Sequence, residues 1–559
     1  MNRKKTASAV VWRGVTHAML LAGSILFAAP FIWLLSTSSK VNDELYPPKW
    51  IPQIPRGVIE SPYIDVRDNE RPLKPVLVSV EDWQRLFLPV CDAISGAIEG
   101  YRDEFPEFYG PFLTNRVWAE AVFARLLRRA PDVVFTKMNS EATAWFVENT
   151  TPKLCREVFD TVYRRVALSD VVLHGWDLSI ERPTAGANFS WRVVDGDAVV
   201  VSRPEGLDRP GQEVRYSFAK RGSFRVETIL PTAMRLEDLK RVVVSNHCDR
   251  SWHTLWATVE MEGRKFVSAQ SAFSGTDLWQ ETTWQFASED DDSIKMKTWL
   301  RLEAAGVSEF VEPGKIRVTV EYRYAPRIFA TFNKYTDNYR KALRIAPMTL
   351  YVRNSVLLVL LNVVGQVLGS SLVAFSFARL RWPGRDACFF LVLATMMIPP
   401  QVTMIPVFLI FKELGWYNSL KPLWVTSFFG GAFNIFLLRQ FMLGIPRDLE
   451  DSAKIDGCSY FRIYRSIVLP LIKPALATIG IFTFLYVWND FMGPLVYLTD
   501  QRLYPLSLGL FALQALQGGA FSYGLMMSAS VMMTVPVILL FFSAQRTFIQ
   551  GVTLSGLKG

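Results

Sequence analysis

The sequence predicts an α-helical polytopic membrane protein with six transmembrane helices and an inserted extracytoplasmic α+β region that ends in a β-sandwich-like domain. Three observations predict this fold. Apolar runs long enough to cross a bilayer lie near the two ends of the chain. Between about residues 50 and 345 the sequence is rich in charge and has no such run. Basic residues flank alternate ends of successive runs, as the positive-inside rule requires.

The composition agrees with a membrane protein that carries a large water-exposed part. Of the 559 residues 50% are apolar, which is high for a soluble protein. The net charge of +9 comes largely from Arg and Lys beside the apolar runs, where these residues orient the chain and meet anionic lipid. We therefore do not read the charge as a nucleic-acid site. The three cysteines of the insertion are an odd number at wide spacing, which leaves two alternatives, three free thiols or one disulfide formed in an oxidising periplasm.

The first apolar run extends from about Val15 to Ser36 and follows Arg3, Lys4, Lys5 and Arg13. A cleavable signal peptide also has a basic start, but this run is longer and lacks a clear small-x-small cleavage site. We therefore expect a retained span with a cytoplasmic N-terminus. Five further spans are expected at about 355–377, 387–411, 423–442, 474–498 and 523–545.

The charge pattern sets the expected topology. Arg379, Arg381 and Arg385 follow the second span, a charged loop follows the fourth, and Arg546 follows the sixth. These segments fit the cytoplasm, so both termini are expected there and residues 46–345 outside. The chain then divides into residues 1–45 with the first span, a mainly helical region at 46–168, a β-rich domain at 169–325, and a core at 326–559 with a cytoplasmic loop at 446–470.

The two parts of the insertion differ in period. Ser79 and Pro152 mark helix starts in the first part. In the second part about eight short strands alternate with turns such as those at Gly196, Gly222 and Gly263, which suggests a β-sandwich. The expected strands are 191–194, 199–202, 214–218, 223–227, 256–261, 265–269, 295–302 and 315–324.

Aromatic and acidic residues of the insertion allow alternatives. Trp252, Trp256, Trp279, Trp284 and Trp299 either stack against sugar rings on an exposed face or belong to the core and to strand pairs. The cluster His247, Cys248, Asp249 and His253 resembles metal ligands, but its spacing matches no standard zinc pattern. The acidic run 289–292 is either a calcium site or a solvated loop. We predict no metal, no cofactor and no catalytic residue.

The loop at 446–470 has a readable local structure. Pro446 precedes Asp448, a candidate N-cap, and Gly457 is a candidate C-terminal stop, so a helix of about two turns is expected at 449–456. Ala453 and Gly457 are four residues apart and share one face of that helix, where another surface can approach the backbone closely. On spacing alone, an ordinary amphipathic loop between membrane helices is the alternative.

The loop resembles the EAA loop of ATP-binding-cassette importer permeases, a pattern of Glu-Ala-Ala, three residues, Gly, nine residues, Ile, any residue and Leu-Pro. Its spacing is kept, although Asp451 replaces the usual Glu and Ser452 the first Ala. The runs 433–441 and 488–491 are similar to the maltose-type carbohydrate permeases in particular. The resemblance covers about residues 348–546 and the first forty, and it assigns ATPase coupling to Glu450, Asp451, Ser452, Ala453, Gly457, Ile467, Leu469 and Pro470.

The resemblance implies a sugar or oligosaccharide importer subunit in the cytoplasmic (inner) membrane. Its partners would be a second homologous permease, two ATPase subunits and an extracytoplasmic solute-binding protein, with membrane lipid around it. The chain has no Gly-rich phosphate loop ending in Gly-Lys-Ser/Thr, so it is expected to be no enzyme, with ATP and magnesium held by the partner ATPases. The alternative function is a membrane-anchored sensor or assembly protein that uses the permease-like core and a ligand-binding β domain.

Polar residues inside the spans are candidates for the substrate pathway, because they are costly in lipid and face the bundle interior. Asn362, Gln366 and Ser370 follow one another at intervals of four and share a helix face, beside Gly365 and Gly369. Prolines must interrupt the third span near Gln401. Interhelical hydrogen bonding without substrate contact is the alternative role for the whole set, which is Asn362, Gln366, Gln401, Asn434, Asn489 and Asp490.

Overall fold

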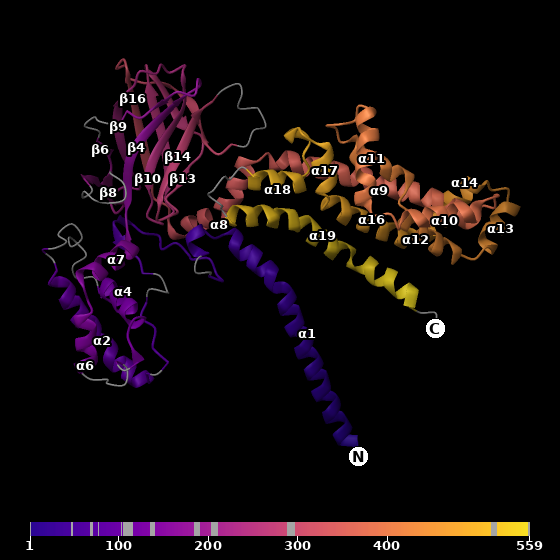
Figure 1. Ribbon diagram of the computed structural model, residues 1–559, viewed down its shortest axis with the longest axis horizontal. Coiled ribbons are helices and arrows are strands. Elements are labelled where there is room, and N and C mark those ends of the chain that lie inside the picture. The colour runs from indigo at the N-terminus through magenta and orange to yellow at the C-terminus, as the bar shows by residue number, and fades with distance from the viewer. Residues whose placement is uncertain are drawn as a thin grey trace. The chain divides into compact units, whose positions relative to one another are not determined.

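The computed structural model describes residues 2–45, 49–66, 71–76, 78–101, 103, 116–132, 134, 140–183, 190–202, 211–287, 297–515 and 523–556. The chain forms two compact units, which are coloured along the sequence in Figure 1. The first, here called the membrane unit, comprises Met1–Gln53, Asp290–Thr298 and Tyr335–Gly559. The second, here called the inserted unit, comprises Ile54–Glu289 and Trp299–Lys334.

The membrane unit is helical. Its described elements are α1 (Asn2–Ser38), η1 (Asn42–Glu44), α9 (Met348–Arg379), α10 (Arg385–Thr395), α11 (Pro400–Glu413), η5 (Lys421–Leu423), η6 (Val425–Phe429), α12 (Ala432–Leu443), α13 (Asp448–Ile455), α14 (Tyr460–Ile463), η7 (Tyr464–Val468), α15 (Leu469–Leu471), α16 (Lys473–Trp488), α17 (Met492–Tyr497), η8 (Gln501–Leu503), α18 (Leu506–Ala515) and α19 (Tyr523–Gly556). Helix α8 (Arg327–Ile345) begins in the inserted unit and ends in this one.

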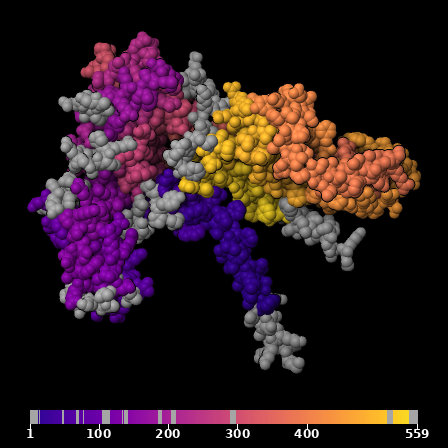
Figure 2. Space-filling view, in the orientation of Figure 1, coloured from indigo at the N-terminus to yellow at the C-terminus, as the bar shows by residue number. Residues whose placement is uncertain are grey.

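Three described helices are long and apolar enough to cross a membrane, at Gly14–Ser38, Met348–Arg379 and Tyr523–Gln545. The number rises to six if each of three bent helix pairs is one span. The sharpest bend, 101°, separates α10 from α11 at the predicted proline interruption. Most side chains of α1 between residues 14 and 35, in indigo in Figure 2, are exposed, and Phe27 is 80% exposed. An all-round apolar, exposed helix suits a lipid environment.

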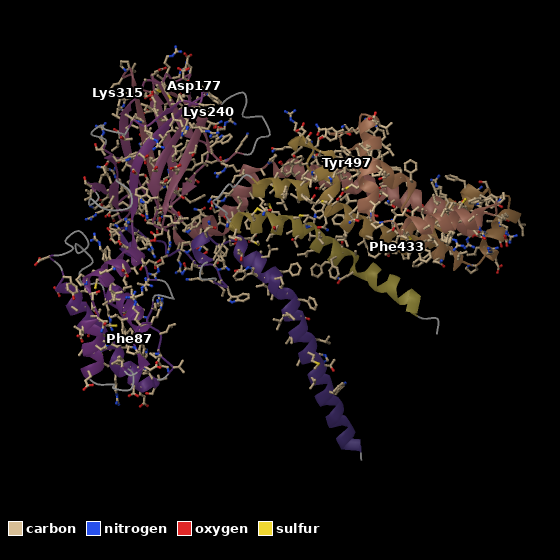
Figure 3. All side chains as sticks on the ribbon, viewed as in Figure 1. Phe87, Asp177, Lys240, Lys315, Phe433 and Tyr497 are labelled. Atoms are coloured by element: carbon tan, nitrogen blue, oxygen red, sulfur yellow. The ribbon has the colours of Figure 1, made fainter. Side chains whose placement is uncertain are left out.

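Helix α9 lies at the centre of the membrane unit, where it contacts α12, α16, α18 and η6. Its small residues make these approaches close, as the sequence predicts. A Cβ added to Gly369 would lie 2.3 Å from the carbonyl oxygen of Phe428, and one on Gly365 would lie 2.7 Å from the Phe428 ring. Figure 3 labels Phe433 on α12 and Tyr497 on α17 within this unit.

The inserted unit combines a helical cluster with a large sheet. Its helices are α2 (Val80–Glu99), α4 (Arg116–Leu127), α6 (Ser140–Glu148) and α7 (Pro152–Val162). Ser79 accepts from the Asp82 N–H as the N-cap of α2, and Pro152 opens α7, as predicted. Figure 3 labels Phe87 among these helices, where its ring packs against Trp83 and Phe123.

The sheet of the inserted unit is one continuous antiparallel sheet except for the parallel pair β14–β15. Its path is β1-β8-β4-β10-β14-β15-β12-β11-β16-β9-β6, and a second, two-stranded sheet pairs β2 with β3. The strands are β1 (Glu60–Ser61), β2 (Tyr63–Ile64), β3 (Tyr163–Arg164), β4 (Val166–Gly175), β5 (Ile180–Glu181), β6 (Arg192–Asp195), β7 (Ala198–Ser202), β8 (Gln212–Ser217), β9 (Ser223–Pro231), β10 (Leu239–His247), β11 (Thr254–Met261), β12 (Arg264–Ser268), β13 (Ala272–Phe273), β14 (Trp279–Phe286), β15 (Leu300–Val307) and β16 (Lys315–Arg323).

Side chains from both halves of this sheet share one core, so the sheet folds over on itself in a sandwich-like arrangement. Val166 and Val242 come from one half, and Val226 and Val318 from the other. The predicted turn at Gly196 joins β6 to β7 with a φ of 97°. Charged residues lie at one end of the sheet, where Figure 3 labels Asp177, Lys240 and Lys315.

Candidate functional site

The 446–470 loop is built around α13. The helix begins at Asp448 with Arg447 as its N-cap, so Asp448 is the first helical residue and not the cap that the sequence suggested. Asp448, Glu450 and Asp451 in the first turn still favour the helix, because negative charge is stabilised at a helix N-terminus.

Gly457 ends α13 as predicted. Its φ is 77°, in the left-handed region that suits glycine. The Cys458 N–H donates to the Ala453 carbonyl at 2.9 Å, and the Gly457 N–H donates to the Lys454 carbonyl at 3.0 Å. These two bonds form a Schellman motif, which satisfies the last carbonyls of the helix.

Ala453 and Gly457, which were predicted to share one contact face of α13, differ in exposure. Ala453 is 7% exposed and packs in an apolar cluster with Phe375 and Leu438, so it faces the interior of the membrane unit. Asp451, Ser452 and Gly457 are exposed, and Lys454 pairs with Asp451 at 2.9 Å. Large apolar side chains of the loop that sequence reasoning did not single out are also exposed: Leu449, Ile455, Tyr460 and Phe461.

The rest of the loop holds α13 against the unit. Ser459 caps α14, then one π-helical turn leads into α15 at Leu469. Ile467 and Leu469 pack against the same apolar cluster as Ala453, whereas Pro470 is exposed. The loop therefore presents a charged and apolar outer surface on an apolar base.

Glu450 is buried, unlike its neighbour Asp451. Its Oε1 lies 2.9 Å from Nε of Arg379, the last residue of α9, and the two side chains are 7% and 2% exposed. Sequence reasoning used Arg379 only as a topological charge and missed this pair. The sequence did contain a signal for this pair. Arg379 directly ends an apolar span, and Glu450 lies in a later loop expected on the same side of the membrane.

Polar residues on α9 form a second candidate site. Oε1 of Gln366 accepts from the Gly431 N–H at 2.9 Å, from Asn434 Nδ2 at 3.0 Å and from the Ser370 hydroxyl at 3.2 Å. Asn362 donates Nδ2 to the Leu423 carbonyl at 3.0 Å and accepts from the Ser427 hydroxyl. The structure thus brings Asn362, Gln366 and Asn434 together, each in interhelical hydrogen bonds.

The other pathway candidates lie on different elements. Gln401 is exposed in the first turn of α11. Asn489 is exposed and donates to the Leu485 carbonyl at 2.8 Å. Asp490 is half-buried and accepts from the Gly493 N–H at 3.1 Å, so its carboxylate helps to start α17.

The former metal candidates of the inserted unit have other partners. Among the described residues no group of three or more His, Cys, Asp or Glu side chains is arranged to hold a metal ion, and the run 289–292 lies outside them. Asp249 accepts from Tyr216 at 2.7 Å and from Ser251 at 2.6 Å. Burial raises the pKa of the Cys248 thiol to about 12, which makes it unreactive.

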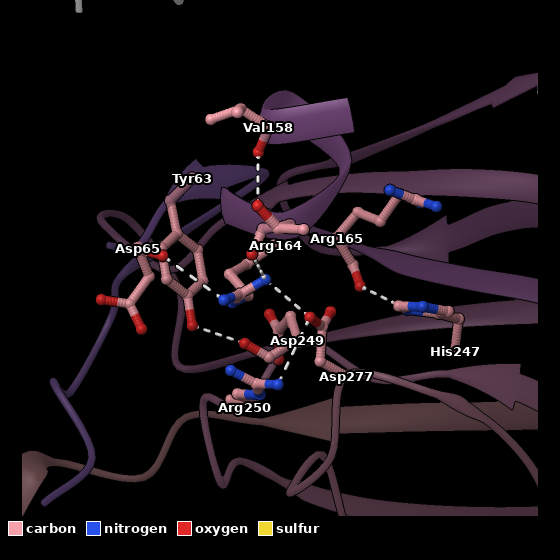
Figure 4. A network of polar contacts seen from close by, with 10 residues as sticks. Tyr63, Asp65, Val158, Arg164, Arg165, His247, Asp249, Arg250 and Asp277 are labelled. Atoms are coloured by element: carbon pink, nitrogen blue, oxygen red, sulfur yellow. Dashed lines mark hydrogen bonds and ion pairs between the residues drawn. The ribbon is translucent and has the colours of Figure 1, made fainter. Parts of the chain in front are cut away.

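The network around Asp249 joins the helical cluster to the sheet (Figure 4). Tyr63 donates its hydroxyl to the Asp249 carbonyl at 2.5 Å, and buried Arg164 pairs with Asp277 at 2.6 Å. Of the predicted aromatic face, Trp252 and Trp284 are buried, so both belong to the interior. Arg323 lies over Trp256 and Arg241 over Trp299.

Known proteins match the C-terminal part of the chain. The family described as "Binding-protein-dependent transport system inner membrane component" matches residues 366–554, which excludes the inserted unit. The arabinooligosaccharides transport system permease protein AraQ of Bacillus subtilis is 37% identical over 37% of this chain and 72% of its own. The sn-glycerol-3-phosphate transport system permease protein UgpE of Salmonella typhi is 32% identical over 37% of this chain and 73% of its own. A solved bacterial ABC transporter that imports the acidic polysaccharide alginate is 26% identical, with a TM-score of 0.35 over 37% of this chain and 78% of that one.

Proposed function

Because this chain belongs to the binding-protein-dependent transport system inner membrane components, we propose that it is the permease subunit of an ATP-driven sugar or oligosaccharide importer. The observation that carries the proposal is the 446–470 loop. Its spacing matches the EAA pattern, and α13 stands with an exposed outer face on a buried base. A partner can therefore bind α13 from outside while the base transmits force inward.

The partners follow from the chemistry that the chain lacks. With no phosphate-binding loop in its sequence it cannot bind ATP in that way, so we assign hydrolysis to two separate ATPase subunits. We assign their contact to the exposed side chains of the loop, Leu449, Ile455, Tyr460 and Phe461, with Gly457 between them. A second permease and an extracytoplasmic solute-binding protein complete the proposed importer. We also propose that the chain lies in the cytoplasmic membrane with both termini and this loop on the cytoplasmic side.

The substrate class rests on the relatives. A protein named for arabinooligosaccharide transport is 37% identical, and one named for sn-glycerol-3-phosphate is 32% identical. We therefore propose a sugar or oligosaccharide, moved by alternating access past the polar group of Asn362, Gln366 and Asn434. The inserted unit, outside the family match, is proposed as an outer docking or sugar-capturing domain.

The proposal is tested by uptake in a strain that lacks this chain, complemented by the wild-type gene or by an empty vector. Radiolabelled arabino-oligosaccharides and maltodextrins are the probes. Uptake restored by the wild-type gene supports import, and the tagged chain should co-purify with an ATPase and a second permease. A chain that restores no uptake and binds no ATPase would instead favour the sensor or assembly function. Deletion of residues 60–325 should keep membrane insertion and reduce uptake.

A further inference from the structure

A single arginine joins three helices at one end of the membrane unit. Arg379 ends α9, and its Nε lies 2.9 Å from Oε1 of Glu450 in α13. Its Nη2 also donates to the backbone carbonyls of Met442, near the end of α12, and of Ile445, the latter at 2.9 Å. The side chain of Arg379 therefore connects α9, α12 and α13.

Burial makes this ion pair costly to separate. The side chains of Arg379 and Glu450 are 2% and 7% exposed, and apolar residues such as Phe375 and Met442 surround the region. A buried charge that loses its partner is strongly unfavourable, so the two residues separate only if both become solvated. Displacing α13 alone would require that separation, whereas displacing α13 together with α9 would not.

A second buried contact ties the same loop to α9. The hydroxyls of Ser371, on α9, and Tyr464, in η7, are 2.7 Å apart and both residues are buried. Ser371 precedes Arg379 by eight residues, or about 12 Å along the helix. Two attachments at that separation fix the orientation of the loop relative to α9 as well as its distance.

Helix α9 continues from these attachments to the polar group inside the unit. Gln366 lies thirteen residues before Arg379, about 20 Å along the same helix. Its Oε1 accepts hydrogen bonds from the Gly431 N–H and from Asn434. One rigid element thus connects the loop surface with the polar residues, although in sequence the loop is joined to α12 and α16.

We propose that α9 transmits movement from the 446–470 loop to the polar residues inside the unit. Arg379 is the positioning residue that couples α9 to α13. We call this transmission the α9 coupling. Movement of the 446–470 loop by an ATPase is transmitted through Arg379–Glu450 and Ser371–Tyr464 into α9, which carries Gln366 and the residues hydrogen-bonded to it. This inference rests on the proposed function, since it concerns how a bound ATPase acts on the chain. The two-state element biased by the ATPase is α9 with its attached loop.

The test compares E450Q, R379Q and the exchange R379E/E450R in the complete transporter, purified with its partner subunits and reconstituted in liposomes. ATPase subunits bound per chain, the rate of ATP hydrolysis and solute taken up per ATP hydrolysed are measured separately. The matched control is D386N, which removes the partly exposed Arg385–Asp386 pair at the start of α10.

We expect E450Q and R379Q to keep bound ATPase and hydrolysis while uptake per ATP falls roughly fivefold or more, the usual range of coupling between sites. In R379E/E450R, uptake per ATP should lie between the single variants and wild type. The exchange restores two opposite charges but not the donors to the Met442 and Ile445 carbonyls. D386N should keep the wild-type ratio. A merely structural pair would lower assembly and uptake together and leave uptake per ATP unchanged.

If assembled E450Q takes up as much solute per ATP hydrolysed as wild type, the α9 coupling is wrong. It is also wrong if D386N lowers uptake per ATP as much as E450Q does. If R379Q does not assemble, Y464F replaces it, because this change removes only the hydroxyl that contacts Ser371. Unchanged uptake per ATP in Y464F also counts against the α9 coupling. Failure of the proposed function is distinguishable, because the wild-type complex itself would then show no ATP-dependent uptake, which overturns both.

Discussion

The Ala325 N–H donates to Nδ1 of His253 at 3.0 Å, and Nε2 of the same ring lies 2.9 Å from the Val58 carbonyl oxygen. A backbone N–H can only donate, so Nδ1 is the acceptor and the imidazole proton is on Nε2, which donates to Val58. The ring therefore holds together the first and last segments of the inserted unit and must be neutral to do so.

Acid should weaken the inserted unit through His253. Burial lowers the pKa of its imidazole, although nearby Asp249 opposes the shift. The unfolded chain takes up a proton near pH 6.5 and the folded unit does so only at lower pH, so stability is lost as pH falls below about 6.5, by at most about 1.4 kcal/mol per pH unit. Proteolysis of the full chain in detergent at pH 7 and pH 5 measures this loss of stability. In H253Q stability should be lower at pH 7 and its pH dependence shallower; equal slopes for the two proteins would contradict the assignment.

The Arg164–Asp277 pair should be a main support of the inserted unit. The Arg164 side chain is fully buried, pairs with Asp277 at 2.6 Å and donates to the Thr161 carbonyl at 2.9 Å. R164M leaves Asp277 with Arg250 at 3.6 Å as its remaining ion-pair partner among the described residues, and should cost about 3 kcal/mol. The measure is the rate of proteolysis of the unit in the detergent-solubilised chain.

An exposed ion pair provides the control for that substitution. Arg221 and Asp195 form a pair in which both side chains are well exposed, at 65% and 40%. R221M should change stability by no more than about 0.5 kcal/mol. If R164M and R221M behaved alike, burial would not be what makes the Arg164 pair important.

The close approach of α9 to η6 should not tolerate a methyl group. A Cβ on Gly369 would meet the Phe428 carbonyl oxygen at 2.3 Å and the Gly430 nitrogen at 2.9 Å, both backbone atoms that cannot turn aside. G369A should therefore destabilise the membrane unit by about 1–3 kcal/mol, the usual cost of overpacking. The yield and thermal stability of monodisperse protein in detergent report the effect.

Gly480 is the matched control, since it also lies in a helix of this unit. Its added Cβ would lie 3.6 Å from Val363 Cγ1, an ordinary contact. G480A should therefore behave as wild type. Equal losses in G369A and G480A would show that any added methyl group is harmful in this unit, and would remove the argument from close packing.

Local rules predicted well those elements whose physics is local. Pro399 and Pro400 interrupt a span because proline removes a donor and crowds the preceding turn, and the helices bend there by 101°. Gly457 ends α13 because a left-handed residue closes the Schellman motif. Ser79 caps α2 through its own side chain. Each of these features depends on residues within about one turn.

Features that depend on tertiary surroundings were not predictable. Strand β10 was missed because its residues 242–247 are buried on both faces, as at Val243 and Ser245, so the sequence shows no period of two there. Ala453 was assigned with Gly457 to a contact face, because helix periodicity says which residues share a face but not which way that face points. The role of Arg379 required knowing that Glu450, 71 positions later, returns beside it.

Gly457 should be required for coupling and not for folding of the membrane unit. With φ at 77° and no atom within 4 Å of an added Cβ, a side chain there meets backbone strain without a steric clash. G457V should cost about 1–2 kcal/mol at the end of α13 and loosen its Schellman motif. We expect less ATPase to co-purify and uptake to fall, while the detergent-solubilised chain stays monodisperse. In the control G444A, φ is −75° and the added Cβ has an ordinary 3.4 Å contact, so both measurements should match wild type. Normal ATPase recruitment and normal uptake by G457V would show that the end of α13 does not form the coupling surface.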